Sequence, residues 1–266
     1  MCKEKLLSPK IFELKVVHDI LDEYFSRWKG EIPNRLLING MPAIQREIIY
    51  MRDQFSRYIE ILKVIPKSPR RLMVLDVGIG YGHLSILVKK LFDYEVFGID
   101  IRRPEVYHWK KRFDGEGIKF ELCNLIKDPI PFQDEYFDIV LFCEVLEHLS
   151  VRSLQIALKK INRVLKKDGV LILTTPNLAG LGSRLRLLRG SSPIPIDDFK
   201  FGHIRTYTAT ECISILQKSG FSIQNIHFKN VYTTSSLLHK LLFFLYKLIP
   251  ALRNCIISKA KKNPKN

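Results

Sequence analysis

The sequence lacks the cysteine pattern of a disulfide-stabilised protein. Its five cysteines, in 266 residues, are scattered along the chain and form no C-x-x-C pair. We therefore expect reduced thiols, as in proteins of the cytoplasm. The first residues also lack the apolar core of a signal peptide. Both absences predict a cytoplasmic protein.

Acidic residues are scarce relative to basic ones. The chain has 43 Lys and Arg against 27 Asp and Glu, a formal net charge of +16, and residues 229–266 hold eight Lys and Arg with no Asp or Glu. A basic surface favours anionic partners such as phospholipid headgroups, RNA or phosphorylated metabolites, although such charge can also serve solubility alone. The 46% of hydrophobic residues excludes a disordered chain.

A glycine-rich loop is present, but it lacks the spacing of a dinucleotide-binding loop. Residues 74–84 are V-L-D-V-G-I-G-Y-G-H-L, which is G-x-G-x-G, whereas the dinucleotide fingerprint is G-x-G-x-x-G and would need glycine at His83. Asp76, directly before the loop, would oppose a pyrophosphate. An acid at this position suits a cationic ligand group instead.

Hydrophobic periodicity divides the chain into a helical start and an alternating remainder. Residues 1–70 have apolar residues at helical spacing, interrupted by Pro33, Gly40 and Pro42. From Leu72 onward, short apolar strands alternate with helices, which predicts an α/β fold with a doubly wound, mostly parallel sheet and ligands at the carboxyl ends of its strands. The expected strands are 72–77, 94–99, 118–122, 137–143, 170–175 and 221–228, with a seventh at 254–258.

Several motifs in order resemble those of class I S-adenosylmethionine-dependent methyltransferases, in particular the methyltransferase type 11 and ubiquinone-type O-methyltransferase group. They are Asp76 with its three glycines, Asp100 after the second strand, F-D-I-V at 137–140 and K-K-D-G at 166–169. The resemblance covers about residues 70–228. It implies a Rossmann-like, three-layer α/β/α fold with a seven-stranded sheet.

The same resemblance implies S-adenosylmethionine as methyl donor. Asp76 would lie near the sulfonium and amino groups, the glycines would line the methionine end, and Asp100 would hold the ribose. Asn124 stands where the family often has Asp, and it could equally be a turn residue. The predicted cofactor-binding residues are Asp76, Gly78, Gly80, Gly82, Asp100, Ile101, Asn124, Leu125 and Glu144.

The segment E-V-L-E-H-L at 144–149 is the candidate catalytic and metal-binding motif. A helix starting here would place Glu144, Glu147 and His148 on one face, able to hold a divalent cation or to position a general base. The alternative is a structural role, with Glu147 favouring a helix start and His148 packed on a loop. The segment is similar to one in ubiquinone-type O-methyltransferases and small-RNA 2′-O-methyltransferases. In some of these it binds Mg²⁺ or a related metal, and His203 corresponds to a fourth ligand.

The resemblance thus gives two predicted sets that overlap. The catalytic set is Glu144, His148 and His203. The metal set is Glu144, Glu147, His148 and His203.

We expect three regions. Residues 1–70 form a helical cap, and residues 71–228 form the methyltransferase core, in which an insertion at about 178–205 is a substrate lid or a solvated basic helix. Residues 229–266 form a basic amphipathic element that completes the sheet. Within it, residues 237–250 are too few to span a membrane. They suit either an interfacial helix, giving peripheral membrane contact through 234–250, or a buried helix.

The expected function is transfer of a methyl group from S-adenosylmethionine to oxygen on a small-molecule or lipid-like acceptor. Two alternatives remain open at this point: an RNA methyltransferase, suggested by the charge and the histidine–carboxylate set, and a non-catalytic regulator that binds the cofactor. The sequence does not identify the acceptor.

Overall fold

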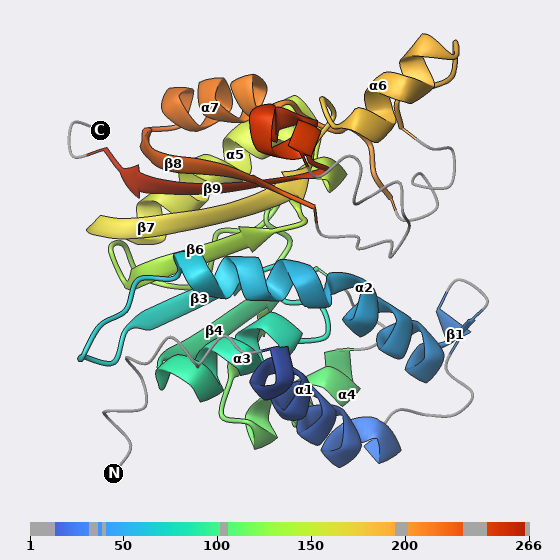
Figure 1. Ribbon diagram of the computed structural model, residues 1–266. Coiled ribbons are helices and arrows are strands. Elements are labelled where there is room, and N and C mark those ends of the chain that lie inside the picture. Colours follow the sequence, from blue (N-terminus) through green and yellow to red (C-terminus); the bar gives the residue numbers. More distant parts are fainter. Residues whose placement is uncertain are drawn as a thin grey trace. The chain divides into compact units, whose positions relative to one another are not determined.

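The computed structural model describes residues 14–31, 37–38, 41–101, 106–194, 202–230 and 244–263. The chain divides into two compact units, Met1–Asn124 and Leu125–Asn266. Each unit contains part of a β-sheet together with helices (Figure 1).

The first unit begins with helices and continues into alternating strands and helices. Parallel pairing joins β3 to β4 and β4 to β5. The helices are α1 (Leu14–Trp28), the short 3-10 helix η3 (Lys29–Glu31), α2 (Ala43–Val64), α3 (His83–Phe92) and α4 (Val106–Gly115). The strands are β1 (Leu37–Ile38), β2 (Met41–Pro42), β3 (Met73–Val77), β4 (Glu95–Asp100) and β5 (Lys119–Leu122).

The central strands of this unit are buried along nearly their whole length. Val74, Leu75, Val96 and Phe97 are each at most 2% exposed. Such continuous burial is expected when helices cover both faces of a parallel sheet, because no strand face then meets water. The loops at the carboxyl ends of β3 and β4 are thereby fixed by a rigid core.

The second unit contains the other half of the strands. Strands β6 and β7 are parallel, and β9 is antiparallel to both β7 and β8. The strands are β6 (Phe137–Cys143), β7 (Leu165–Pro176), β8 (Phe221–Lys229) and β9 (Cys255–Lys262). The helices are η4 (Leu146–His148), α5 (Val151–Val164), α6 (Leu181–Leu188), α7 (Ala209–Lys218) and η6 (Pro250–Leu252).

Local sequence explains where the two longer helices of the second unit begin. Ser150 caps α5, since its hydroxyl accepts a hydrogen bond from the backbone of Ser153. Thr208 and Glu211 form a capping box at α7, each side chain bonding the other's backbone N–H. Helix α7 lies next to β8, and α6 projects beyond the end of β7 (Figure 1).

The strand order is β5-β4-β3-β6-β7-β9-β8, the order of one seven-stranded sheet. The prediction of a seven-stranded, mostly parallel, Rossmann-like sheet is confirmed. The antiparallel seventh strand is longer than the expected 254–258. Helix α4 was not among the elements predicted from the sequence.

Two other expectations differ from the structure or lie outside it. The prediction of a helix starting at Glu144 was wrong. Only a single 3-10 turn, η4, follows β6, and the next α-helix begins at Val151. Of the predicted interfacial segment 234–250, residues 234–243 lie outside the described residues. In the part of the chain that the structure describes, no helix is long and apolar enough to cross a membrane.

Candidate functional site

The glycine-rich loop of the first unit connects β3 to α3. Gly78, Gly80 and Gly82 all have positive φ, at 79°, 54° and 80°. At Gly82 a Cβ would lie 2.4 Å from the Phe113 ring, so only glycine fits there. At Gly80 a Cβ would meet nothing closer than the Gly78 carbonyl oxygen at 3.9 Å. The loop backbone is therefore packed at Gly82 and open to a close approach at Gly80.

Asp100 contacts this loop directly. It ends β4, is 7% exposed, and its Oδ2 accepts a hydrogen bond of 3.0 Å from the Gly80 backbone N–H. The following residue, Ile101, is 56% exposed. The structure thus brings the predicted ribose-binding carboxylate to the glycine loop.

Asp76 is buried beside the same loop. Its Oδ2 accepts a hydrogen bond of 2.7 Å from the Ser85 hydroxyl. Burial raises the pKa of Asp76 to about 7, the negative charge of Asp100 adds to this, and the Ser85 hydrogen bond opposes it. A cationic group bound nearby would favour the ionised form of this carboxyl group.

A buried polar network supports His83, the first residue of α3, and no motif in the sequence indicates this network. His83 Nε2 lies 3.2 Å from Glu47 Oε1, and its Nδ1 lies 3.4 Å from the Tyr58 hydroxyl. Arg112 donates to both oxygens of Glu47. Burial alone would raise the pKa of Glu47, but the hydrogen bonds and charges of His83 and Arg112 lower it to about 2.

The helices before β3 also contact the glycine loop. The Tyr24 hydroxyl, on α1, donates a 2.9 Å hydrogen bond to the Tyr81 carbonyl oxygen. The Tyr81 ring stacks on the His83 ring, with their centroids 5.7 Å apart. Together with Glu47 on α2, these contacts tie both N-terminal helices to the loop. No motif in the sequence identifies these residues, because they lie far apart along the chain.

In the second unit, Glu144 follows β6 in a left-handed conformation with φ of 57°. Its backbone N–H donates to the Thr174 carbonyl oxygen at 3.0 Å, and its carboxylate accepts a 2.9 Å hydrogen bond from the Thr174 hydroxyl. These two bonds to β7 explain why the chain does not enter a helix here. A non-glycine residue held in this conformation is characteristic of functional sites.

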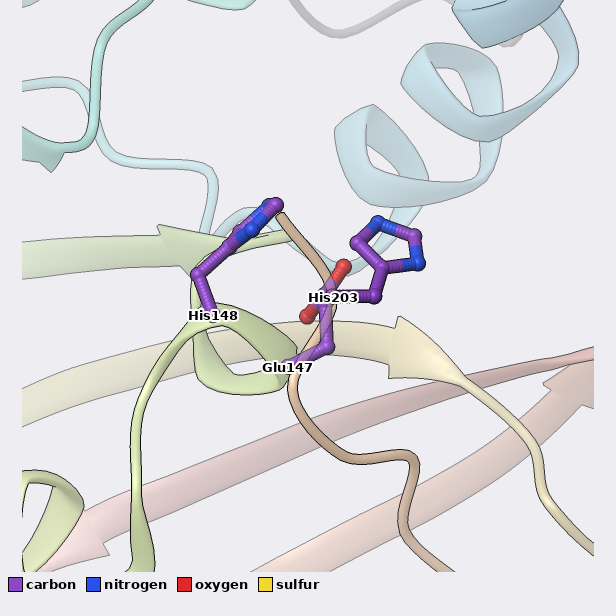
Figure 2. A group of neighbouring side chains, drawn as sticks. All are labelled: Glu147, His148 and His203. Carbon is purple, nitrogen blue, oxygen red and sulfur yellow. The ribbon is translucent and has the colours of Figure 1, made fainter. Parts of the chain in front are cut away.

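Glu147, His148 and His203 come together although His203 is far away in the sequence. One ligand atom from each residue lies within 4.8 Å of the others (Figure 2). The backbone explains the approach, since the N–H groups of Ile204 and Arg205 both donate to the Glu147 carbonyl oxygen. The two imidazole rings meet edge to face, with centroids 4.9 Å apart.

The remaining contacts of this trio orient its side chains. The Glu147 carboxylate is fully buried and accepts a hydrogen bond of 3.1 Å from the Thr175 hydroxyl. His148 Nδ1 lies 3.0 Å from the Gly202 carbonyl oxygen, which can only accept, so Nδ1 carries the proton. In the neutral ring, Nε2 is then the nitrogen that can bind a proton or a metal ion.

Two other predicted site residues, Asn124 and Leu125, lie in the sequence where the first unit ends and the second begins. Asn124 is half-buried after β5 and is the last residue of the first unit. Leu125 is buried in the second unit, where its carbonyl oxygen accepts a 2.9 Å hydrogen bond from Lys160 Nζ. Glu144, predicted as a metal ligand, is not part of the group formed by Glu147, His148 and His203.

Comparison with known proteins agrees with this topology. Residues 75–173 match the family described as "Methyltransferase domain". The predicted resemblance to methyltransferases is therefore confirmed over these residues. The matched segment begins in β3 and extends into β7.

Individual proteins give the same picture. A ubiquinone/menaquinone biosynthesis C-methyltransferase of Desulfotalea psychrophila is 35% identical over 52% of this chain and 56% of its own length. The chain thus spans about half the length of this curated relative.

Solved structures share the fold. A chain of the Haloferax volcanii complex that contains the Trm112 methyltransferase activator matches with a TM-score of 0.62 and 12% identity, over 83% of this chain and 95% of its own. An S-adenosylmethionine-dependent methyltransferase of Archaeoglobus fulgidus matches with a TM-score of 0.54 and 21% identity, over 82% of this chain and 94% of its own.

Proposed function

We propose that the protein transfers a methyl group from S-adenosylmethionine to an oxygen atom of a small-molecule or lipid-like acceptor. The methyltransferase domain at residues 75–173 supports the reaction class. The choice of oxygen depends on one observation, the orientation of His148. Its Nδ1 is committed to the Gly202 carbonyl oxygen, which leaves Nε2 as a proton acceptor.

The loop of the first unit fits the donor. Gly80 leaves room for a ligand to approach the backbone, and Asp76 offers a buried carboxyl group that a cation would stabilise in its ionised form. The Asp100 carboxylate, at the end of β4, is hydrogen-bonded to the same loop, where it suits the hydroxyl groups of a ribose. When bound, S-adenosylmethionine supplies a methyl group made electrophilic by the sulfonium. Ile101 and Asn124, which belong to the same unit, complete the donor-binding set that we propose for it.

The residues of the second unit act on the acceptor in this proposal. An acceptor hydroxyl must lose its proton as the new bond to carbon forms, and an imidazole can take up a proton near neutral pH. His148 Nε2 is the accepting atom. His203, whose ring lies against that of His148, and Glu144, held by Thr174, position this base and the acceptor.

A divalent metal ion bound by Glu147, His148 and His203 is a second candidate for the same group. The convergence of a carboxylate oxygen and two imidazole nitrogens within 4.8 Å favours it. This donor set suits Zn²⁺, Mn²⁺ or Fe²⁺ better than Mg²⁺, which prefers oxygen ligands. A bound ion would polarise the acceptor oxygen, and His148 would then be a ligand and not a base.

The test is a reaction of labelled donor with separate pools of lipids, small metabolites and RNA. We expect label in an O-methylated lipid or small molecule. His148→Ala should lower turnover about a hundredfold or more, the size of effect seen for general bases, with donor affinity unchanged. His227→Ala, on β8, is the control and should leave turnover unaltered. An unaffected rate in His148→Ala would remove the base from the proposal.

The same experiment distinguishes the rival functions. Label in RNA, with an affinity that falls steeply as salt is raised, would favour an RNA methyltransferase. Donor binding without turnover of any pool would favour a non-catalytic regulator. The similar structure from Haloferax volcanii contains a Trm112 methyltransferase activator. The assay should therefore be run with and without a protein of that type.

A further inference from the structure

Helix α6 is a surface element that contributes nothing to the core of its unit. None of its side chains is buried, and three leucines are exposed: Leu185 by 40%, Leu187 by 56% and Leu188 by 83%. Single exposed leucines are common, but three within four positions of one helix are not. Helix α6 also stands apart from the strands of its unit (Figure 1).

Three of the four leucines of α6 form a stripe that is bordered by positive charge. Leu181, Leu185 and Leu188 recur at i, i+4 and i+7, so they share one face of the helix. Arg184 and Arg189 border this face, and Arg186 lies on another side. No Asp or Glu occurs between residues 176 and 194, so nothing in this segment neutralises the three arginines.

A second exposed element of the same unit has the same chemistry. Residues 244–248 are helical, and Phe244, Leu248 and Ile249 are exposed by 66%, 64% and 47%. Lys247 is exposed between them. Exposed apolar side chains beside basic ones thus occur at two places in a chain whose net charge is +16.

We propose that α6 docks the protein on an anionic phospholipid surface, with the Leu181–Leu185–Leu188 face in the headgroup layer and the arginines against lipid phosphates. Long basic side chains place their apolar stems along such a surface while the charge stays in the polar layer. A helix of eight residues is about 12 Å long, which suits a position in the plane of the interface. RNA would use the arginines but not the leucines, since nucleic acid stacks on aromatic rings.

This inference deepens the proposed function by indicating an acceptor that resides in or near the lipid layer. That part rests on the proposed function, whereas the docking surface itself does not. Docking would raise the concentration of such an acceptor near the enzyme. The two would then meet by diffusion within the membrane plane.

The test is co-sedimentation of the full chain with vesicles of phosphatidylcholine alone or with about one third phosphatidylglycerol. We expect binding to the anionic vesicles that weakens as salt is raised. Leu188→Gln should reduce the partition coefficient about tenfold, because the leucine side chain leaves the apolar layer. Arg189→Gln should reduce it about fivefold. Leu187→Gln, an equivalent change on a different face of α6, should alter it less than about twofold.

Equal binding to both vesicle types, no binding, or an unchanged partition coefficient in Leu188→Gln would overturn the proposal. Binding of the chain to RNA but not to vesicles would also overturn it. Calorimetry with the donor on the same samples separates the two hypotheses. Vesicle binding without donor binding contradicts the proposed function alone, and donor binding without vesicle binding contradicts the docking surface alone.

Discussion

The Glu47 carboxylate on α2 and the Arg112 guanidinium on α4 face each other through two hydrogen bonds of 2.7 and 3.0 Å, and neither side chain is more than 2% exposed. The same carboxylate contacts His83, the residue with which α3 begins. A buried pair of this kind is costly to break, because removal of one charge leaves the other in the interior. The Glu47–Arg112 pair, contributed by α2 and α4, therefore holds the first residue of α3 in place.

We predict that Glu47→Gln lowers the free energy of unfolding by about 3 to 5 kcal/mol, measured by denaturant titration near neutral pH. Glu23→Gln is the control, because its partner Arg27 and Glu23 itself are both exposed, and it should cost less than about 1 kcal/mol.

The effect of Glu47→Gln should also depend on pH. The pKa of Glu47 is lowered to about 2 in the folded protein, so its stabilising contribution is present above the unfolded pKa and is lost as the pH falls toward 2. The difference between wild type and variant should therefore shrink in acid. A difference that stays constant from neutral pH to about pH 3 would contradict this assignment.

Asp76→Asn should have the opposite effect on stability. Burial raises the pKa of Asp76 to about 7, so the folded protein holds a proton that the unfolded chain releases, and stability falls as the pH rises from about 4 to 7. Removing the charge should raise the free energy of unfolding by about 2 to 4 kcal/mol near pH 8 and by little near pH 4. Asp93→Asn, at an exposed position, should change stability little at either pH.

The same variant tests the role of Asp76 in the proposed donor site. Because an ionised carboxyl group would attract a cationic ligand, we expect wild type to bind S-adenosylmethionine more tightly as the pH rises through about 7. Asp76→Asn should lose most of this affinity in calorimetry. A variant that is more stable and still binds the donor normally would remove Asp76 from the donor site.

Gly82→Ala should be harmful through backbone conformation and through packing. Gly82 has a φ of 80°, and a Cβ would lie 2.4 Å from the Phe113 ring. The left-handed conformation and the overlap together should cost about 2 to 4 kcal/mol and weaken donor binding. Gly182→Ala is the matched control, because no atom lies within 4 Å of its Cβ position in helix α6. It should be neutral or stabilising by about 0.5 to 1 kcal/mol.

The metal hypothesis predicts one divalent ion per chain by elemental analysis after equilibration with Zn²⁺ or Mn²⁺ and removal of excess metal. Glu147, His148 and His203 would be its ligands, so His203→Ala should abolish binding, whereas His227→Ala should retain it. Chelation by EDTA should then stop turnover. A chain without bound metal, with turnover that EDTA does not affect, would leave His148 as the general base.

Much of the fold was predictable because its signals are local. Leu72–Val77 has the apolar character of a strand covered on both faces, and the three glycines after it mark a tight turn. The order of strands and helices follows from such segments, and the family resemblance supplied the sheet and the donor. The capping residues Ser150 and Thr208 show in retrospect where α5 and α7 begin.

The site was less predictable because its contacts are not local. Glu144 was expected to begin a helix, and only its bonds to Thr174 on β7 explain its left-handed conformation. Glu47 and Arg112 lie 65 residues apart, and nothing in the sequence distinguishes Glu47 from the other acids of α2 as the one with a buried partner. His203 was paired with His148 by resemblance, and no spacing in the sequence would have shown it.

The position of β9 has a consequence for how this protein is made. Strand β9 lies between β7 and β8, although both are synthesised before it. During synthesis, neither β8 nor the neighbouring edge of β7 can form its hydrogen bonds to β9 until residues 255–262 have left the ribosome. During that interval β7 has an unpaired strand edge, which is the kind of surface through which incompletely folded chains associate.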